Sequence, residues 1–442
     1  MTLGRCVRRV TWVAALIACA GCDADSSGRG ADAEVDATTS QPPPVEAGLD
    51  ANVGGSAAGH DGATAGAGGA AGGNAGMGGP DGAVDAASPD DSGFDSGGLD
   101  AATPPMTTHV YVGGYGAEIT HFVLDRATGG LEHREATSAA SAPSYLAIHP
   151  LGDALYAINE QSGEGSEIIA FAIDPENGAL SMINSVPSGG EGSPHLAVHP
   201  SGQWVAVAHY GSGHTSILPV REDRGLDGVI DIDRGPGDSA RKAHQAVFDA
   251  RGTTLLVPCL ESGYVLQYQF NLGAIALSAP PTVAVEGGPR HLVLSPDQRY
   301  AYVLSELDSL LTSFAYDGMT GLLSSPQTID SEEDTKGASA HVAIHPSGRW
   351  LYASNRAENS LGVFSIDASG RPHAVAHVRS GIATPRDFGI DPLGEYLIVA
   401  NQGGAQDLRV FRIDAGNGTL TFVNATNVGG SPSFVGFVLL PQ

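Results

Sequence analysis

The stretch PRHLVLSPDQRYAYVLSE, residues 289–306, decides the fold, because its pattern recurs along the chain. It consists of a short apolar run, a tight turn and a second apolar run, which is typical of two antiparallel strands joined by a hairpin. Five further copies and one partial copy follow the same pattern: PSYLAIHPLGDALYAINE (143–160), SPHLAVHPSGQWVAVAHY (193–210), KAHQAVFDARGTTLLVPCL (242–260), SAHVAIHPSGRWLYASNR (339–356), PRDFGIDPLGEYLIVANQ (385–402) and PSFVGFVL (432–439).

The copies return at a nearly constant spacing. Alignment places one residue of each copy in a single column, with steps of 50, 49, 47, 50, 46 and 47 residues between Tyr145, His195, His244, His291, His341, Asp387 and Phe434. A repeat of this length that is rich in glycine and short apolar runs is typical of a β-propeller, in which each repeat forms one blade. Seven copies predict seven blades.

Each repeat has room for two more strands after the hairpin. The third strand ends in a recurring turn in which glycine supplies the positive φ that such hairpins need, as in DRATGGL (125–131), DPENGAL (174–180), DGMTGLL (317–323) and DAGNGTL (414–420). We therefore predict an all-β fold, a seven-bladed propeller of four-stranded antiparallel blades.

The last copy, PSFVGFVL, lacks a second, third and fourth strand after it. Residues 109–116, 119–131 and 132–140 have the patterns of those missing strands. The N- and C-terminal segments of a domain at 107–442 should therefore share one blade, which closes the ring and leaves no exposed sheet edge.

The N-terminus has the features of an export signal at 1–22: basic Arg5, Arg8 and Arg9, then an apolar stretch and small residues before Cys22. It resembles bacterial lipoprotein signals, in which lipid is attached to the new N-terminal cysteine. We expect Cys22 to be the lipid site, with Cys19 and an ordinary cleaved signal as alternatives. The lipid would be the chain's only contact with a membrane.

Residues 23–106 consist mainly of Gly, Ala, Asp, Ser and Pro. Such a segment buries too little apolar surface to offset its ordering entropy, so we expect a disordered tether. With the signal, this predicts an exported lipoprotein of the bacterial cell envelope, on its periplasmic or surface face.

Charge and cysteine content exclude several classes of function. The net charge of -27 argues against binding to nucleic acid or to an anionic membrane face. Of four cysteines only Cys259 lies in the repeat region, so a disulfide framework or a cysteine zinc site is excluded there. We expect a monomer.

Propeller geometry predicts where polar groups gather. The start of the first strand and the end of the second lie on the same face of a blade, so one mouth of the channel should collect two sets of residues. The strand starts supply His195, His244, Arg290, His291, His341, Arg386 and Asp387; the strand ends supply Glu160, Tyr210, Glu306, Asn355, Arg356 and Gln402.

Arg290, Arg356 and Arg386 would form a cationic patch suited to a carboxylate or phosphate. The alternative is that each arginine pairs with an acid such as Glu306 and clamps blades together. The histidines at the mouth could act as general bases near neutral pH or pack between blades.

Other catalytic signatures are missing from the repeats. No H-E-x-x-H pattern supports a metal, and no G-x-S-x-G elbow, P-loop or dinucleotide fingerprint is present. We expect neither a metal nor a cofactor. His149, His199 and His345 precede turns at the far end of their strands, where we expect structural roles.

These motifs resemble the seven-bladed β-propeller lactonases, namely bacterial 6-phosphogluconolactonases of the propeller type and the related carboxymuconate-lactonising enzymes. The resemblance covers about 107–442, and its most specific part is GPRHLVLSPDQRYAYVLSEL (288–307). It implies that His244, Arg290 and Glu306 act on a cyclic ester and that Arg386 binds the anionic group of the substrate.

The resulting hypothesis is a lactone hydrolase that acts on a small anionic sugar-acid lactone in carbohydrate metabolism. His244 or Glu306 would activate water, Arg290 would stabilise the oxyanion, and Arg386 with Arg356 would orient the acid group. His291, His195 and His341 are further candidates for substrate binding. Two alternatives stay open: a non-catalytic binding propeller tethered at the cell surface, and a lactonising isomerase that uses the same residues.

Overall fold

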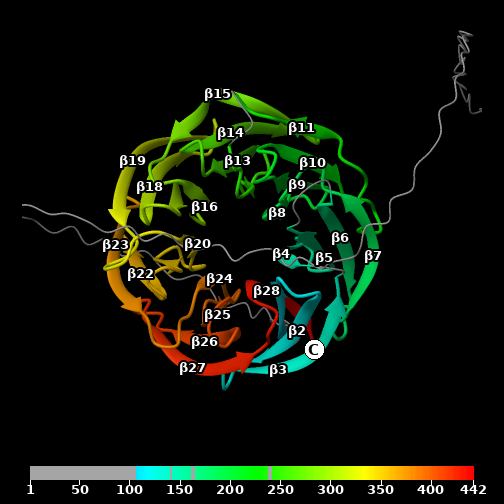
Figure 1. Cartoon of the computed structure of the whole chain (residues 1–442), viewed down its shortest axis with the longest axis vertical. Coiled ribbons are helices and arrows are strands. Elements are labelled where there is room, and N and C mark those ends of the chain that lie inside the picture. The colour runs from blue at the N-terminus through cyan, green and yellow to red at the C-terminus, as the bar shows by residue number, and fades with distance from the viewer. Residues whose placement is uncertain (1–105, 140–141, 161–164, 237–240) are drawn as a thin grey trace, which may run out of the picture. The chain divides into compact units, whose positions relative to one another are not determined.

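The computed structural model describes residues 106–139, 142–160, 165–236 and 241–442. These residues form seven four-stranded antiparallel sheets around a central axis (Figure 1). The seven-bladed all-β propeller that the repeats predict is therefore confirmed. The signal and tether interpretations fall on residues outside the described part of the chain. Within that part, no helix has the length and apolar character to cross a bilayer.

The blades follow one another in chain order, and the first strand of each complete repeat is the innermost (Figure 1). The first three blades contain β4 (Pro143–Ile148), β5 (Ala154–Asn159), β6 (Glu167–Ile173) and β7 (Leu180–Pro187); β8 (His195–Val198), β9 (Trp204–Ala208), β10 (Thr215–Pro219) and β11 (Asp231–Asp233); and β12 (Val247–Phe248), β13 (Thr254–Cys259), β14 (Tyr264–Asn271) and β15 (Ala274–Ala284). The next three contain β16 (Pro289–Leu294), β17 (Tyr300–Ser305), β18 (Leu310–Asp317) and β19 (Leu322–Asp330); β20 (Ser339–Ile344), β21 (Trp350–Asn355), β22 (Ser360–Ile366) and β23 (Pro372–Val378); and β24 (Pro385–Ile390), β25 (Tyr396–Asn401), β26 (Asp407–Ile413) and β27 (Leu420–Asn427).

The seventh blade joins the two ends of the domain, as expected. Its sheet order is β28 (Pro432–Pro441), β1 (Met106–Gly114), β2 (Glu118–Asp125) and β3 (Gly130–Ser138). β1 pairs with β28 along its whole length, from Met106 opposite Pro441 to Gly114 opposite Pro432. The strand begins at Met106, one residue before the expected start of the domain, because that residue still has a partner in β28.

The recurring turn after the third strand has the conformation that its sequence predicts. In DRATGGL, the Asp125 carboxylate accepts a hydrogen bond from the backbone N of Ala127, and Gly129 adopts a φ of 73°. In DPENGAL, Asp174 and Gly178 repeat this arrangement, with a φ of 76°. The left-handed conformation explains why glycine recurs at this position.

The third blade departs from the repeat in its innermost strand. β12 contains only two residues, whereas the inner strands of the fourth to sixth blades contain six. Ala243 still forms an isolated bridge with Cys259, and His244 N donates to Pro258 O. Pro258 has no N–H to donate in return, so the ladder between Ala243 and Val247 is incomplete.

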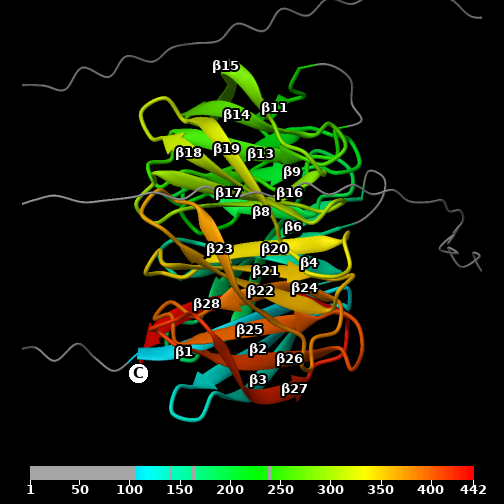
Figure 2. The same cartoon turned by 90° about the vertical axis from the view of Figure 1, so that its left-hand side faces the viewer.

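The hydrophobic core lies between neighbouring blades, which pack face to face (Figure 2). In one cluster, Tyr111 and Val438 of the closing blade pack with Leu155 and Phe171 of the next blade, and all four are buried. Similar clusters fill the other interfaces, for example between Tyr302 and Leu351. Alternating apolar residues on both faces of each sheet thus stabilise the ring.

The three histidines that precede the hairpin turns link each blade to the next, which confirms their structural role. Their Nε2 atoms lie 3.2, 2.8 and 2.9 Å from carbonyl oxygens of the following blade. The pairs are His149 with Gly202, His199 with Gly252, and His345 with Gly394.

Replacing His199 with alanine should destabilise the domain by about 2 kcal/mol, because it leaves the Gly252 carbonyl unpartnered and opens a cavity. His373→Ala is the matched control, since that histidine is exposed and pairs only with exposed Asp367. Urea unfolding measures both variants. Equal stability of the two would contradict an interblade role for His199.

Candidate active site

The ends of the paired strands bring the predicted polar residues to one mouth of the channel. In the fourth blade the first residue of β16, Pro289, pairs with the last residue of β17, Ser305. In the sixth blade Pro385 of β24 pairs with Asn401 of β25. Residues at strand starts and strand ends therefore lie side by side, as the topology predicts.

Two arginines at this mouth occupy β-bulges. The ladder changes register between Pro289 and His291, and again between Pro385 and Asp387. Arg290 and Arg386 are the intervening residues. A bulge removes a residue from the regular ladder and redirects its side chain, which accounts for the turn of both arginines toward the channel mouth.

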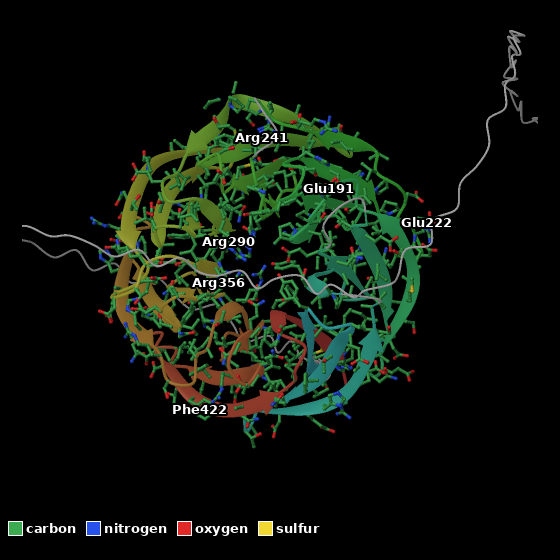
Figure 3. All side chains as sticks on the ribbon, viewed as in Figure 1. Glu191, Glu222, Arg241, Arg290, Arg356 and Phe422 are labelled. Carbon is green, nitrogen blue, oxygen red and sulfur yellow. The ribbon has the colours of Figure 1, made fainter. Side chains whose placement is uncertain are left out.

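A small pocket lies at this mouth, near the centre of the ring. The pocket is shallow: its cavity volume is only about 10 Å³, about that of one water molecule, so a larger molecule would lie over its opening. Apart from Pro194, its lining consists of polar side chains from several blades: Ser144, Tyr145, Glu160, His244, Arg290, His291, Arg386, Asp387 and Ser433. Figure 3 shows Arg290 and Arg356 beside the central axis.

Arg290, Glu306 and Arg356 form one connected cluster. Nε of Arg290 lies 2.9 Å from Oε2 of Glu306, and Nη2 of Arg356 donates to Oε1 of the same carboxylate at 2.6 Å. Arg290 also donates to the Ala340 carbonyl, and Arg356 donates to the Ala338 carbonyl. The backbone N of Glu306 donates to Gly288 O, which holds the carboxylate beside Arg290.

The charges of this cluster depend on one another. Burial lowers the pKa of Arg290 to about 9, still well above neutrality, and the Glu306 charge limits the decrease. Burial alone would raise the pKa of Glu306, but the charges of Arg290 and Arg356 outweigh it and lower that pKa. At neutral pH the cluster therefore contains two cations and one anion, and carries a net positive charge.

Arg386 is less engaged than the other two arginines. Its Nη2 atom lies 3.5 Å from Oε2 of Glu160, and its guanidinium group stacks over the Tyr115 ring at 5.1 Å. The Tyr115 hydroxyl donates to Glu160 at 2.6 Å. No shorter ion pair holds Arg386 within the described residues, so it retains the most capacity to bind an anion.

The seven residues that align in the repeats form a ring of side chains at the bottom of the pocket. They are Tyr145, His195, His244, His291, His341, Asp387 and Phe434. Tyr145 and His195 pack with ring centroids 4.1 Å apart, and those of His244 and His291 are 5.3 Å apart. Nδ1 of His291 lies 2.8 Å from Nδ1 of His341, a hydrogen bond that requires one proton between the two nitrogens. The column thus connects neighbouring blades around the axis.

All four histidines of the column are neutral at neutral pH, because burial opposes a charge there. Burial lowers the pKa of His195, His244 and His291 well below the usual value, and that of His341 to about 3. The charges of Arg290 and Arg386 lower the pKa of His244 further. Its Nδ1 has no hydrogen-bond partner among the described residues, so this neutral imidazole has an unused nitrogen.

The structure places the predicted residues in two layers. His244, Arg290, His291 and Arg386 line the pocket. The others contact that layer from behind or beside it: Glu306 and Arg356 through ion pairs, His195 through Tyr145, and His341 through His291.

The pocket also contains residues that the sequence-based site omitted. Tyr145 and Asp387 align with the mouth histidines of the other repeats, and Glu160 lies at the end of a second strand. The repeat pattern alone indicated no role for these three residues. Tyr115 comes from the closing blade and reaches Glu160, a contact that no sequence pattern indicates. Among the described residues, no three His, Cys, Asp or Glu side chains converge as they would around a metal ion.

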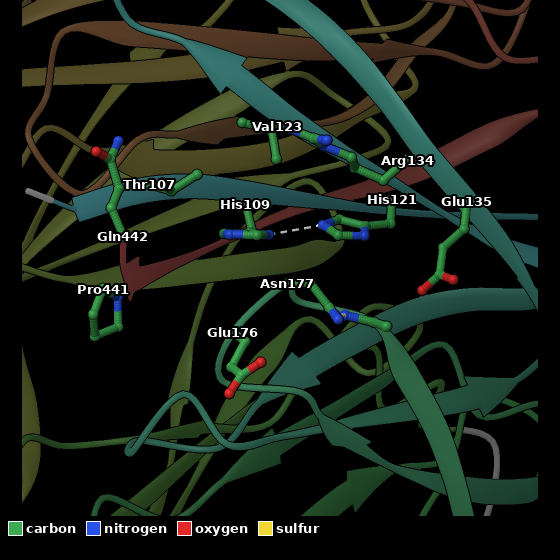
Figure 4. Close-up of a pocket in the computed structure, with 11 residues that line it drawn as sticks. Thr107, His109, His121, Val123, Arg134, Glu135, Glu176, Asn177, Pro441 and Gln442 are labelled. Carbon is green, nitrogen blue, oxygen red and sulfur yellow. Dashed lines mark hydrogen bonds between the residues drawn. The ribbon is translucent and has the colours of Figure 1, made fainter.

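A larger pocket lies at the opposite end of the closing blade, beside Thr107 and Pro441 (Figure 4). At its base Nδ1 of His109 lies 2.9 Å from Nε2 of His121. Of the arginines in the described part of the chain, only Arg134 lines it. This pocket lacks the cluster of cations found at the mouth, so the small pocket is the better candidate active site.

Comparisons with known proteins agree with this geometry. Residues 109–437 match the family model described as lactonase, 7-bladed beta-propeller. The chain is 29% identical to a 6-phosphogluconolactonase of Bacillus subtilis, over 73% of this chain and 96% of that protein. It is 31% identical to a 6-phosphogluconolactonase of Pectobacterium carotovorum, over 62% of this chain and 82% of that protein.

A solved structure is similar over its full length. The periplasmic gluconolactonase of Pseudomonas aeruginosa superposes with a TM-score of 0.70 and 28% identity, over 76% of this chain and 100% of that one. The family match spans all seven blades and includes Arg290 and Glu306. This chain belongs to the lactonase family of seven-bladed β-propellers.

Proposed function

We propose that the propeller hydrolyses a small lactone that carries an anionic group, most simply a sugar-acid lactone. The observation that carries the proposal is the net positive cluster of Arg290, Glu306 and Arg356, in which Arg290 lines the same small pocket as the neutral His244. The relatives named as 6-phosphogluconolactonases and as a gluconolactonase support this class of substrate.

In the proposed reaction, His244 accepts a proton from water as the water oxygen attacks the lactone carbonyl. Arg290 stabilises the negative charge that develops on the carbonyl oxygen. His244 suits this role better than Glu306, because the arginines engage both oxygens of that carboxylate. Glu306 then serves to hold Arg290 and Arg356 in position.

Arg386 is the proposed anchor for the anionic group of the substrate, since it has no close ion pair of its own. Binding an anion there would offset part of the positive charge that lowers the pKa of His244. The base would thus become stronger when substrate is bound. Substrate binding and base strength are coupled through one electrostatic interaction.

A lactone panel tests this function. The domain should hydrolyse glucono-δ-lactone and its 6-phosphate, and Arg386→Gln should raise KM for the phosphate by about tenfold more than for the uncharged lactone. Release of acid, followed with a pH indicator, measures both. A folded domain that hydrolyses no lactone, including a muconolactone, would support a binding propeller instead.

We also propose that the protein is an exported lipoprotein with lipid at Cys22. The basic, apolar and small-residue segments of 1–22 support this, and a periplasmic member exists among similar structures. Labelling of the full chain with radioactive palmitate should be lost in Cys22→Ser and kept in Cys19→Ser. The reverse pattern would move the lipid site to Cys19.

A further inference from the structure

Asp387 is the only carboxylate in the aligned column, in which the other six positions are histidine or aromatic. Its side chain lines the pocket together with His244, Arg290 and Arg386, and it is only 3% exposed. The β-bulge in β24 places Asp387 directly after Arg386 at the channel mouth. The proposed reaction has so far given this residue no role.

A chain of contacts connects Asp387 to His244 across the bottom of the pocket. Oδ2 of Asp387 lies 3.6 Å from Nδ1 of His341. That nitrogen lies 2.8 Å from Nδ1 of His291, and the His291 and His244 rings are 5.3 Å apart. Four titratable groups therefore follow one another from one side of the pocket to the other.

The surroundings favour the protonated form of Asp387. Burial raises its pKa well above the usual value, and the charges of Arg290 and Arg386 only partly oppose that shift. The other titratable groups that face it, His341 and Tyr145, are uncharged at neutral pH, since burial lowers the pKa of the histidine and raises that of the tyrosine. Two groups whose environments shift their pKa values in opposite directions are the usual acid and base of such a site.

We propose that Asp387 is the general acid of lactone opening and donates its proton to the ring oxygen as the C–O bond breaks. The inference rests on the proposed lactonase function and deepens it. It also assigns His291 and His341 as positioning residues that connect the acid to the base.

The proton balance of the cycle closes. Water loses one proton to His244, and its oxygen forms the new bond to the carbonyl carbon. The tetrahedral intermediate collapses, the bond to the ring oxygen breaks, and that oxygen receives the Asp387 proton. After the product leaves, His244 gives its proton to solvent and Asp387 takes one from solvent, while the product acid loses its own proton to solvent.

Tyr145 also lines the pocket, and its hydroxyl is a second group that could donate a proton. Burial raises the pKa of its hydroxyl well above the usual value, so it holds its proton tightly. Glu160 is engaged by Tyr115 and Arg386. Asp387→Asn should therefore lose most of kcat, whereas Asp367→Asn, the same change at an exposed carboxylate outside the pocket, should retain it.

The decisive experiment compares leaving groups. Asp387→Asn keeps the shape of the side chain but removes the acidic proton, so kcat on glucono-δ-lactone should fall about 100-fold with little change in KM. Dihydrocoumarin and phenyl acetate release a phenoxide, and because a phenol has a pKa of about 10, this group leaves without an acid. With these substrates kcat should change less than about threefold.

The outcomes separate this inference from the function on which it rests. A folded wild-type domain that hydrolyses no substrate overturns the lactonase proposal itself. An active wild type in which Asp387→Asn loses activity equally on alkyl and aryl substrates, or loses none on gluconolactone, overturns only the role of Asp387. If the wild type accepts no aryl ester, Asp387→Glu decides: recovery of kcat above that of Asp387→Asn supports an acid, and equal values reject it.

Discussion

Arg290→Met is expected to lower kcat/KM for a lactone about 1,000-fold, or roughly 4 kcal/mol of transition-state stabilisation. Methionine keeps much of the side-chain volume but cannot donate to the oxyanion. The guanidinium is nearly buried and is already fixed by Glu306 and the Ala340 carbonyl. A preorganised cation of this kind acts without reorganisation during the reaction, so its removal should lower kcat more than it raises KM.

The same substitution also leaves Glu306 with Arg356 as its one remaining ion pair, so some loss of stability should accompany it. A triple variant, Arg290→Met with Glu306→Gln and Arg356→Met, removes all three charges together and leaves none of them unpaired. It should recover stability in urea unfolding while activity stays low. Arg224→Met, which breaks a peripheral pair with Asp153, is the control. If activity recovered together with stability, the role of Arg290 would be only to hold neighbouring side chains in place.

His244→Asn is expected to lower kcat about 1,000-fold and to change the pH profile. The profile of kcat/KM reports the pKa of the base in the free enzyme, and the pKa of His244 is well below its usual value. Because the neutral form is active, the wild-type rate should stay constant as pH falls through 6.5 and should decline only at lower pH. Asparagine cannot titrate, so the acid decline should disappear.

Two variants test the assignment of this decline. Arg386→Gln removes one of the charges that lower the pKa of His244, so its decline should move to higher pH. His214→Asn, which replaces a buried histidine outside the pocket that contacts Gly189 O, should leave the profile unchanged. A decline that persists in His244→Asn would identify another residue as the base.

The fold could be predicted in detail because its information is local. Each hairpin of a blade follows from alternating apolar residues and a turn that positions a glycine such as Gly129 or Gly178 at positive φ. The incomplete terminal repeat then requires β28 to pair with β1, since a propeller closes only when every inner strand has its partners. The short β12 was not foreseen, because it depends on the missing N–H of Pro258 in the partner strand.

Part of the site follows from the same local rules. Arg290 and Glu306 belong to paired ends of adjacent strands in one blade, so the repeat already places them side by side. The bond from Arg356 to Glu306 crosses between blades, and the Tyr115 contact with Glu160 joins the closing blade to the first. Such contacts depend on the distance between blades and on side-chain rotamers, which no periodicity specifies.

The sequence by itself thus determined the seven blades, the closing strand and the mouth at which the polar residues gather, because each follows from hydrogen-bonded neighbours in a regular repeat. Only the tertiary structure decided which of those residues line the pocket and in which protonation state. The pKa values of His244 and Asp387 shift in opposite directions because burial penalises charge, and burial is a property of the assembled ring.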